Sequence, residues 1–235
     1  MDRNQGRNPR TNGTRGSYAV GDERCARILD AAVTHFARWG FNASSMARIA
    51  KDVGITQGGL LHHFRSKEDL LVSVLEHSDE QDVERFFSRN PGNATEAFTA
   101  ILDLAEYNAG RPGRTKMFNV LAGEAGEPAH PAHGYFERRY RTVIDKITAV
   151  LQRDMADGAV EPGTDCEAAA TELVAVMDGL QLQWALAPKT YDMTGRLHLY
   201  ADRLLRSITV DGSGMPARPR PAATDHGPAP GIGLA

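Results

Sequence analysis

Side chains that can bind a nucleic acid gather between residues 56 and 67, TQGGLLHHFRSK. A glutamine can donate to and accept from a base edge, glycines allow a close approach of backbone and DNA, and histidine or lysine can donate to phosphates. The stretch has each of these types: Gln57, Gly58, Gly59, His62, His63 and Lys67. With Lys67 just beyond it, a short helix that carries the other residues of this set predicts contact with the DNA major groove.

The residues just before this stretch predict a helix-turn-helix. Ser44 and Ser45 can cap a helix that ends at Gly54, because glycine takes a left-handed backbone at little cost. Thr56 then caps a second short helix over residues 57–64. In such a motif the second helix enters the major groove while the first braces it on the backbone, so the serines and the threonine join the candidate DNA contacts.

This part of the chain resembles a known family. GITQGGLLHHFRSKEDLL resembles the DNA-binding signature of the TetR family of bacterial transcriptional regulators, and FARWGFNASSMARIAKDVG resembles that family's first two helices. The resemblance spans about residues 24–75. One position departs from it: Leu61 stands where the family usually has a tyrosine that bonds a phosphate. The resemblance places Leu61 among the DNA-contact positions, but without the tyrosine we expect one phosphate contact to be missing there, and His62 or His63 could compensate.

The charge of the chain is divided unevenly. Residues 1–67 hold 11 of the 27 basic residues and 5 of the 30 acidic ones, a net charge of +6, whereas residues 68–235 carry −9. A basic head on an acidic body favours binding of DNA phosphates at one end of the molecule.

The composition is ordinary for a globular protein, with 41% hydrophobic residues in 235. No apolar run approaches membrane-spanning length, and the N-terminus lacks the apolar core of a signal peptide, so we expect a cytoplasmic protein without a membrane partner. Cys25 and Cys166 are the two cysteines, and they lack metal-ligand spacing. They predict free thiols in a reducing compartment, with a redox pair as the alternative.

We expect four segments along the chain. Residues 1–21 are rich in Asn, Gly and Arg and predict a disordered arm that follows the DNA, or alternatively a solubilising tail. Residues 22–67 would form the helix-turn-helix domain, residues 68–210 a helical domain for ligand binding and dimerisation, and the Pro/Gly/Ala-rich residues 211–235 a disordered tail. The arginines of the arm are Arg3, Arg7, Arg10 and Arg15.

Between the two tails, apolar residues recur at helical spacing and predict an all-α fold. After a first helix over residues 22–39 and the helix-turn-helix, the expected helices cover about residues 67–88, 95–110, 114–127, 131–157, 165–187 and 192–210. The helix over residues 67–88 starts in the head and runs into the body, so a movement of the body would tilt the head.

The last two expected helices have more apolar surface than one packing seam needs. Their seams are Leu173, Met177, Leu180 and Trp184, then Leu197, Ala201, Leu204 and Ile208. The residues off these seams are Val174, Val176, Gln181, Leu182, Tyr200 and Leu205. Two faces imply two partners, so we expect a homodimer through these last two helices, which the family resemblance also implies.

Apolar and aromatic residues of the body are candidates to line an effector pocket, with ordinary core packing as the alternative for each. Tyr140 and Gln181 are the more informative, because a polar tip on an apolar face needs a partner. Asp178 could supply one, or alternatively could meet Arg138 or Arg141 or lie at the surface. The candidates are Phe98, Leu102, Met117, Phe118, Leu121, Tyr140, Ile144, Met177, Gln181 and Trp184.

Two segments of the body, GEAGEPAHPAHGYFERRY and VMDGLQLQWALAPKTYDM, resemble regulators of the choline-responsive repressor type. This implies a dimerisation and effector domain without identifying the effector. His130 and His133 could belong to a metal site, but Pro131 and the lack of a nearby cysteine favour a solvated helix entry. With no catalytic motif in the sequence, we expect no metal, no cofactor and no enzymatic activity.

These observations predict a homodimeric, ligand-responsive regulator that binds a double-stranded DNA operator and is released by an unknown small-molecule effector. Two alternatives stay open. One is a helix-turn-helix protein without an effector. The other is a helical enzyme, which explains neither the helix-turn-helix nor the charge division.

Overall fold

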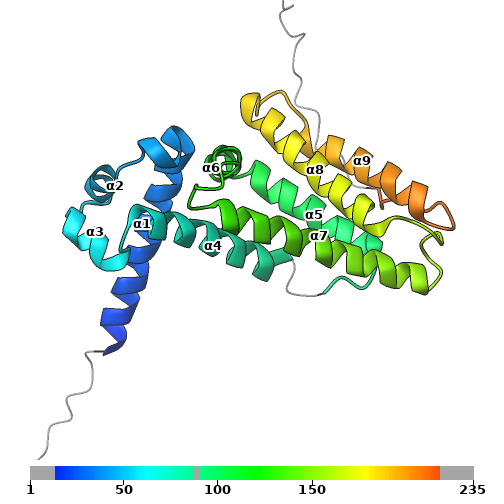
Figure 1. Ribbon diagram of the computed structural model, residues 1–235, viewed down its shortest axis with the longest axis horizontal. Helices are drawn as coiled ribbons and strands as arrows, with labels where there is room; N and C mark the ends of the chain where they lie inside the picture. The colour runs from blue at the N-terminus through cyan, green and yellow to red at the C-terminus, as the bar shows by residue number, and fades with distance from the viewer. Residues whose placement is uncertain (1–13, 87–89, 218–235) are drawn as a thin grey trace, which may run out of the picture.

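The computed structural model describes residues 14–86 and 90–217, and their regular secondary structure is helical (Figure 1). The predicted all-α fold is confirmed. None of the helices in these two ranges is long and apolar enough to cross a membrane. The helices are α1 Thr14–Ala43, α2 Met46–Val53, α3 Gln57–His63, α4 Lys67–Phe86, α5 Ala94–Ala109, α6 Pro112–Glu124, α7 His133–Ala156, α8 Cys166–Leu186 and α9 Met193–Ile208.

The predicted helix-turn-helix is formed by α2 and α3. Gly54 ends α2 with a φ of 79°, and its N–H bonds the carbonyls of the last turn. The Thr56 hydroxyl accepts from the Gly59 N–H at 3.0 Å and caps α3. The serine caps differ from expectation: Ser45 occupies the N-cap without a side-chain bond, while the buried Ser44 hydroxyl donates to the Gly40 carbonyl at 2.6 Å.

The first helix is longer than the sequence predicted. It begins at Thr14, so the expectation of disorder over residues 1–21 is wrong for residues 14–21, which add hydrogen-bonded turns to α1. At its other end it continues past Trp39 through a kink at Gly40, whose φ is 69°. The predicted arm residues Arg3, Arg7 and Arg10 lie outside the described residues, as does the side chain of Arg15.

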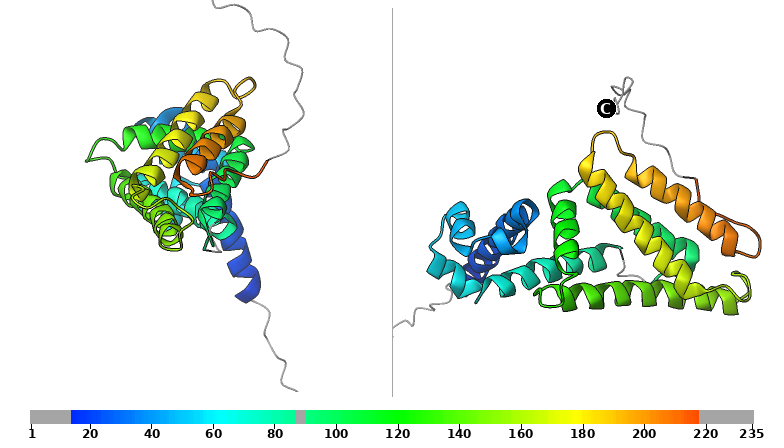
Figure 2. Two further views of the ribbon diagram at one scale, coloured as in Figure 1. Left: turned by 90° about the vertical axis from the view of Figure 1, so that its right-hand side faces the viewer. Right: turned by 45° about the horizontal axis from the view of Figure 1, so that its top comes forward.

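The hydrophobic core around the head (α1 to α3) does not end at residue 67. It also contains residues from α4, Met117 and Leu121 from α6, and Tyr135 and Phe136 from the start of α7. Helix α6 lies against α1 in the views of Figures 1 and 2. A domain boundary placed after α3 therefore divides a continuous core, because α1 packs on α6 as well as on α2.

The core of the body (α5 to α9) extends beyond the expected end of the folded chain. Met215 is buried in it, and its N–H donates to the Asp202 carboxylate at 2.9 Å. The tail predicted over residues 211–235 is therefore packed at least to that point, while residues 218–235 lie outside the described residues.

The predicted packing seams need two corrections. In α9 the buried residue is Leu205 and the half-buried one is Leu204, the reverse of the expectation. In α8 both Val174 and Gln181 are buried rather than presented to a second partner. The spacing of apolar residues identifies the buried face of a helix only to within one position, because at 3.6 residues per turn two adjacent residues can both lie partly on that face.

Candidate functional site

Helix α3 presents a small solvent-exposed face at the end of the head. Gln57, Gly58, Leu61 and His62 are exposed there, and His63 is half-buried. Leu60 and the following Phe64 point into the core and anchor the helix. This arrangement keeps the predicted base and phosphate contacts of α3 accessible to DNA.

Lys67 has a different environment from the one predicted. Its ammonium donates to the carbonyls of Phe41, Asn42 and Ser44 at 3.0, 3.2 and 3.2 Å, and it lies 4.3 Å from the centre of the Phe41 ring. A cation is stabilised at a helix C-terminus because the last carbonyls are free to accept. All three N–H groups of Lys67 are thus used to hold the end of α1, which argues against the direct phosphate bond expected from the sequence.

A second basic feature of the head was missed by sequence reasoning. The guanidinium groups of Arg38 and Arg48 lie 4.9 and 5.5 Å from the ring centre of Trp39. Both arginines are exposed, at the end of α1 and on α2. The Arg38-Trp39 pair is visible in the sequence, but only the fold brings Arg48 to it. These two arginines are additional candidates for phosphate contacts.

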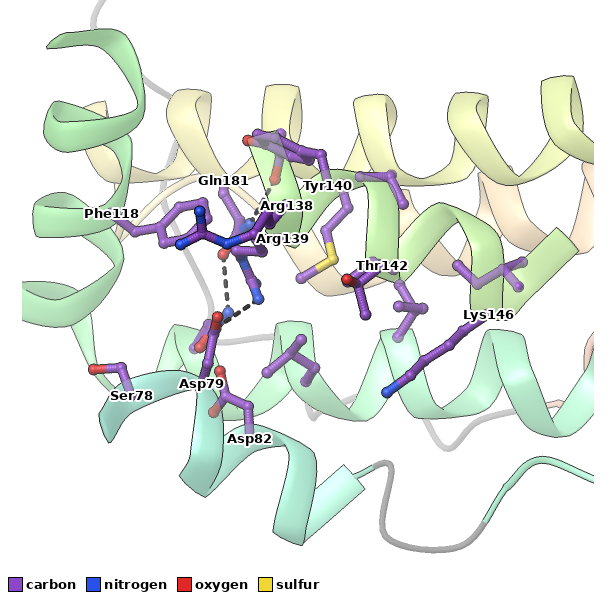
Figure 3. Close-up of a pocket in the computed structure, with 18 of the residues that line it drawn as sticks. Ser78, Asp79, Asp82, Phe118, Arg138, Arg139, Tyr140, Thr142, Lys146 and Gln181 are labelled. Atoms are coloured by element: carbon purple, nitrogen blue, oxygen red, sulfur yellow. Dashed lines mark hydrogen bonds and ion pairs between the residues drawn. The ribbon is translucent and has the colours of Figure 1, made fainter. Parts of the chain in front are cut away.

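The body contains a cavity of about 620 Å³, lined by α4 to α8 and by residues 90 and 91 (Figure 3). Such a volume is typical of small-molecule sites. Half of the ten predicted pocket residues line it: Met117, Phe118, Tyr140, Met177 and Gln181.

The other five candidates do not line the cavity. Phe98, Leu102, Leu121 and Trp184 are buried in the two cores, and Ile144 packs against the body core. A helix inside a bundle is apolar on several sides, and spacing does not reveal which side faces a cavity.

The polar groups expected in the pocket have the expected kind of partner. The Tyr140 hydroxyl donates to Asp178 at 2.7 Å, and Asn108 donates its amide N–H to the Gln181 side-chain oxygen at 3.0 Å. Burial raises the pKa of the Asp178 carboxyl, and burial together with the Asp178 charge raises the pKa of the Tyr140 hydroxyl. Of the alternatives that the sequence left open for Asp178, the structure has the contact with Tyr140.

Two ion pairs at the cavity were not predicted. Arg139 of α7 pairs with Asp79 of α4 at 2.6 Å, and the Tyr135 hydroxyl also donates to Asp79. Arg114 of α6 pairs with the buried Asp82 at 2.7 Å, and burial raises the pKa of that carboxyl. These contacts fasten α4 to α6 and α7. In the sequence, these ion pairs are indicated by two acids three residues apart, Asp79 and Asp82. Their basic partners could not be identified there, because they lie more than thirty residues further along the chain.

His130 and His133, the two candidate metal ligands, contact different partners. His130 is buried, with its Nδ1 accepting from the Ala132 N–H at 3.2 Å and its Nε2 3.6 Å from Glu124. The Nδ1 of His133 lies 2.8 Å from the Ala125 carbonyl. Both rings serve the turn between α6 and α7.

A helix-turn-helix at one end of the described helices, together with a lined cavity in the body, defines a DNA-binding transcriptional regulator. Residues 28–74 match the bacterial regulatory proteins of the tetR family, and residues 129–209 match the C-terminal region of BetI-type transcriptional repressors. The chain belongs to the TetR family, as both segments of the resemblance predicted.

The chain is similar to known regulators over most of its length. It is 21% identical over 182 residues to the fatty acid metabolism regulator protein of Bacillus subtilis, covering 77% of this chain and 94% of that protein. It is 25% identical over 186 residues to the regulator TtgR of Pseudomonas putida, covering 77% and 89%.

Solved structures have the same fold. A complex of SmeT with triclosan matches with a TM-score of 0.71 at 19% identity, over 85% of this chain and 99% of that one. FadR from Bacillus subtilis in complex with stearoyl-CoA matches with a TM-score of 0.67 at 20% identity, over 77% and 97%.

Proposed function

We propose that this protein is a homodimeric repressor whose affinity for its operator is lowered by a small molecule bound in the body cavity. The observation that carries the proposal is a set of shared residues. Leu75 of α4, Met117 of α6 and Tyr135 of α7 line the cavity and also belong to the core of the head. A ligand that moves these side chains must therefore repack the head.

The mechanism is a population shift between two arrangements of the heads. In one, the two α3 helices are spaced to enter successive turns of the major groove; in the other they are not. An effector that binds the second arrangement more tightly lowers operator affinity by the difference between its two binding free energies. The relatives whose structures contain stearoyl-CoA or triclosan support a cavity that takes ligands with a large apolar part.

Exposed leucines on the last two helices support the dimer. Leu182 and Leu186 of α8 are 54% and 82% exposed, and Leu199 of α9 is 58% exposed. Large apolar side chains at the surface of one helix pair favour burial against a partner, and a two-fold axis pairs this surface with itself. Two heads would then meet the two half-sites of a pseudo-palindrome.

The test of the proposed function is a binding titration against the DNA upstream of the protein's own gene, at two salt concentrations, with random DNA as control. Tight, sequence-dependent binding with a strong salt dependence is expected. A metabolite that stabilises the protein on heating should then raise the dissociation constant for the operator. Operator affinity that no stabilising metabolite changes would favour the alternative without an effector.

A further inference from the structure

Helix α7 carries a row of cations along the cavity. Arg138, Lys146 and Arg153 all line it, separated by eight and seven residues, so they recur on one side of the helix. At a rise of about 1.5 Å per residue, the row is about 22 Å long. Figure 3 shows Arg138, Thr142 and Lys146 following one another along this helix beside the cavity.

The acids around the cavity do not neutralise this row. Asp79 and Asp82 are already paired with Arg139 and Arg114. Within the part of the chain that the structure describes, Arg138 and Lys146 form no ion pair, and Arg153 donates to the Pro91 carbonyl, which leaves its charge uncompensated.

Two further acids line the cavity, and both lie on other helices than the row. Glu76 is exposed on α4, and the three cations of the row are exposed as well, so water screens the charges of both. Asp178 accepts from Tyr140, and burial raises the pKa of its carboxyl. The cavity is lined by five basic and four acidic side chains, so the net charge of its lining is positive.

Beside the row, the cavity has an apolar floor. It consists of one face of α5 and the adjoining face of α7, formed by Ala97, Ile101, Leu104, Val143, Ile147 and Val150. The floor runs in the same direction as the cations because both follow α7. An elongated ligand can thus lie on apolar residues while one end stays within reach of a guanidinium or an ammonium group.

On the basis of the ligand-responsive function proposed above, we propose that the cavity binds a single-chain amphiphile with an anionic head group. The hydrocarbon chain lies on the floor formed by α5 and α7. The head group, a carboxylate or a phosphate, pairs with Arg138 or Lys146 at the rim. Anions bind arginine and lysine by charge-assisted hydrogen bonds, and each buried methylene adds affinity by leaving water.

Three probes with the same chain and different head groups test the charge: decanoate, decan-1-ol and decyltrimethylammonium. Each is titrated into the full-length protein by calorimetry, below its micelle concentration or, for decan-1-ol, below its solubility limit. We expect saturable binding of one decanoate per protomer, at least about tenfold tighter than decanol, with decyltrimethylammonium weakest. Lengthening the acid should raise affinity about threefold to fourfold per methylene until the cavity is filled.

Variants of α7 locate the head group. Arg138→Glu combined with Lys146→Glu should lower decanoate affinity by at least about tenfold and leave decanol affinity unchanged. The matched control is Arg141→Glu, which changes an exposed arginine of the same helix that pairs with Glu137 and does not line the cavity. The altered side chains are exposed, so melting curves should show that all variants fold.

Other outcomes overturn the inference. Equal affinities for decanoate and decanol would indicate an apolar site without charge selection, and tightest binding of the cation would mean that Glu76 and Asp178 dominate. No binding of any probe would exclude a single-chain amphiphile. None of these results touches operator binding, so a failure here is distinguishable from a failure of the proposed function.

Discussion

The side chain of Glu124, on α6, accepts a hydrogen bond from the backbone N–H of Phe41 at 2.8 Å and thereby ties the body to the kinked end of α1. The kink is at Gly40, where an added Cβ would overlap the Glu124 carboxylate. Buried His130 lies 3.6 Å from the same carboxylate. The end of the head's first helix is thus fixed by α6, one of the helices that line the cavity, so a ligand that moves α6 can affect the DNA-binding end.

We predict that Glu124→Ala destabilises the protein by about 1–3 kcal/mol, because the Phe41 N–H loses its acceptor in a partly buried place. Urea unfolding measures the change. Glu127→Ala, at an exposed position three residues away, is the control and should change stability by less than about 0.5 kcal/mol. If both variants unfold alike, Glu124 does not hold the end of α1.

Substitutions of Gln57 and Lys67 should affect DNA binding in different ways. Gln57→Ala, on the exposed face of α3, is expected to change which operator sequence is preferred, by about 1–3 kcal/mol at one base pair. Lys67→Met removes three bonds to the end of α1, so it should lower thermal stability and weaken binding to all DNA alike. Titrations with operator variants and random DNA, together with melting curves, separate the two. A sequence-selective effect of Lys67→Met would contradict its structural role.

Leu61→Tyr should tighten DNA binding. Leu61 is 40% exposed on α3, so a tyrosine fits without repacking and its hydroxyl can donate to a phosphate. We expect a gain of about 0.5–1.5 kcal/mol on operator and random DNA alike, with an unchanged salt slope because tyrosine is neutral. Leu61→Phe has the same ring without the hydroxyl and should show no such gain.

Asp178→Asn should change how stability depends on pH. Because burial raises the pKa of Asp178, the folded protein holds this proton more tightly than the unfolded chain, and stability falls as pH rises from the ordinary aspartate pKa through the raised one. Asparagine carries no such cost and still accepts from Tyr140. The free energy of unfolding of the variant, measured with urea, should therefore rise relative to wild type as the pH is raised from about 4 to neutrality. The gain is about 1.4 kcal/mol for every tenfold difference in proton affinity between the folded and unfolded states. Asp145→Asn, exposed on α7, is the control and should show no such gain.

Leu182→Glu combined with Leu186→Glu should give a monomer, because two charges would have to be buried in the proposed interface on α8. Light scattering coupled to size exclusion at micromolar concentration measures the mass. Val210→Glu, at another exposed apolar residue just after α9, should leave the dimer intact. A wild-type protein that is already monomeric would rule out the proposed interface.

Much of the fold followed from local signals in the sequence. Gly54 ends α2 and Thr56 caps α3 as predicted, since a left-handed glycine and a capping hydroxyl act on residues within one turn. The apolar spacing placed α5, α8 and α9 to within about two residues. The resemblance to the TetR family rested on the same short segments.

Contacts between distant segments were decided by the tertiary structure alone. Met117 and Gln181 line the cavity while Phe98 and Trp184 do not, although all four have the same helical spacing pattern of core residues. The sequence predicts that Lys67 binds a phosphate, but the fold places its ammonium group against the carbonyls at the end of α1.

The sequence by itself thus determined most of the helices, the helix-turn-helix and the family, because caps, turns and periodicity are local. The tertiary structure decided which face of each helix lines the cavity and which cations remain free beside it. Those choices depend on partners such as Asp79 with Arg139 and Glu124 with Phe41, which lie 60 and 83 residues apart in the chain.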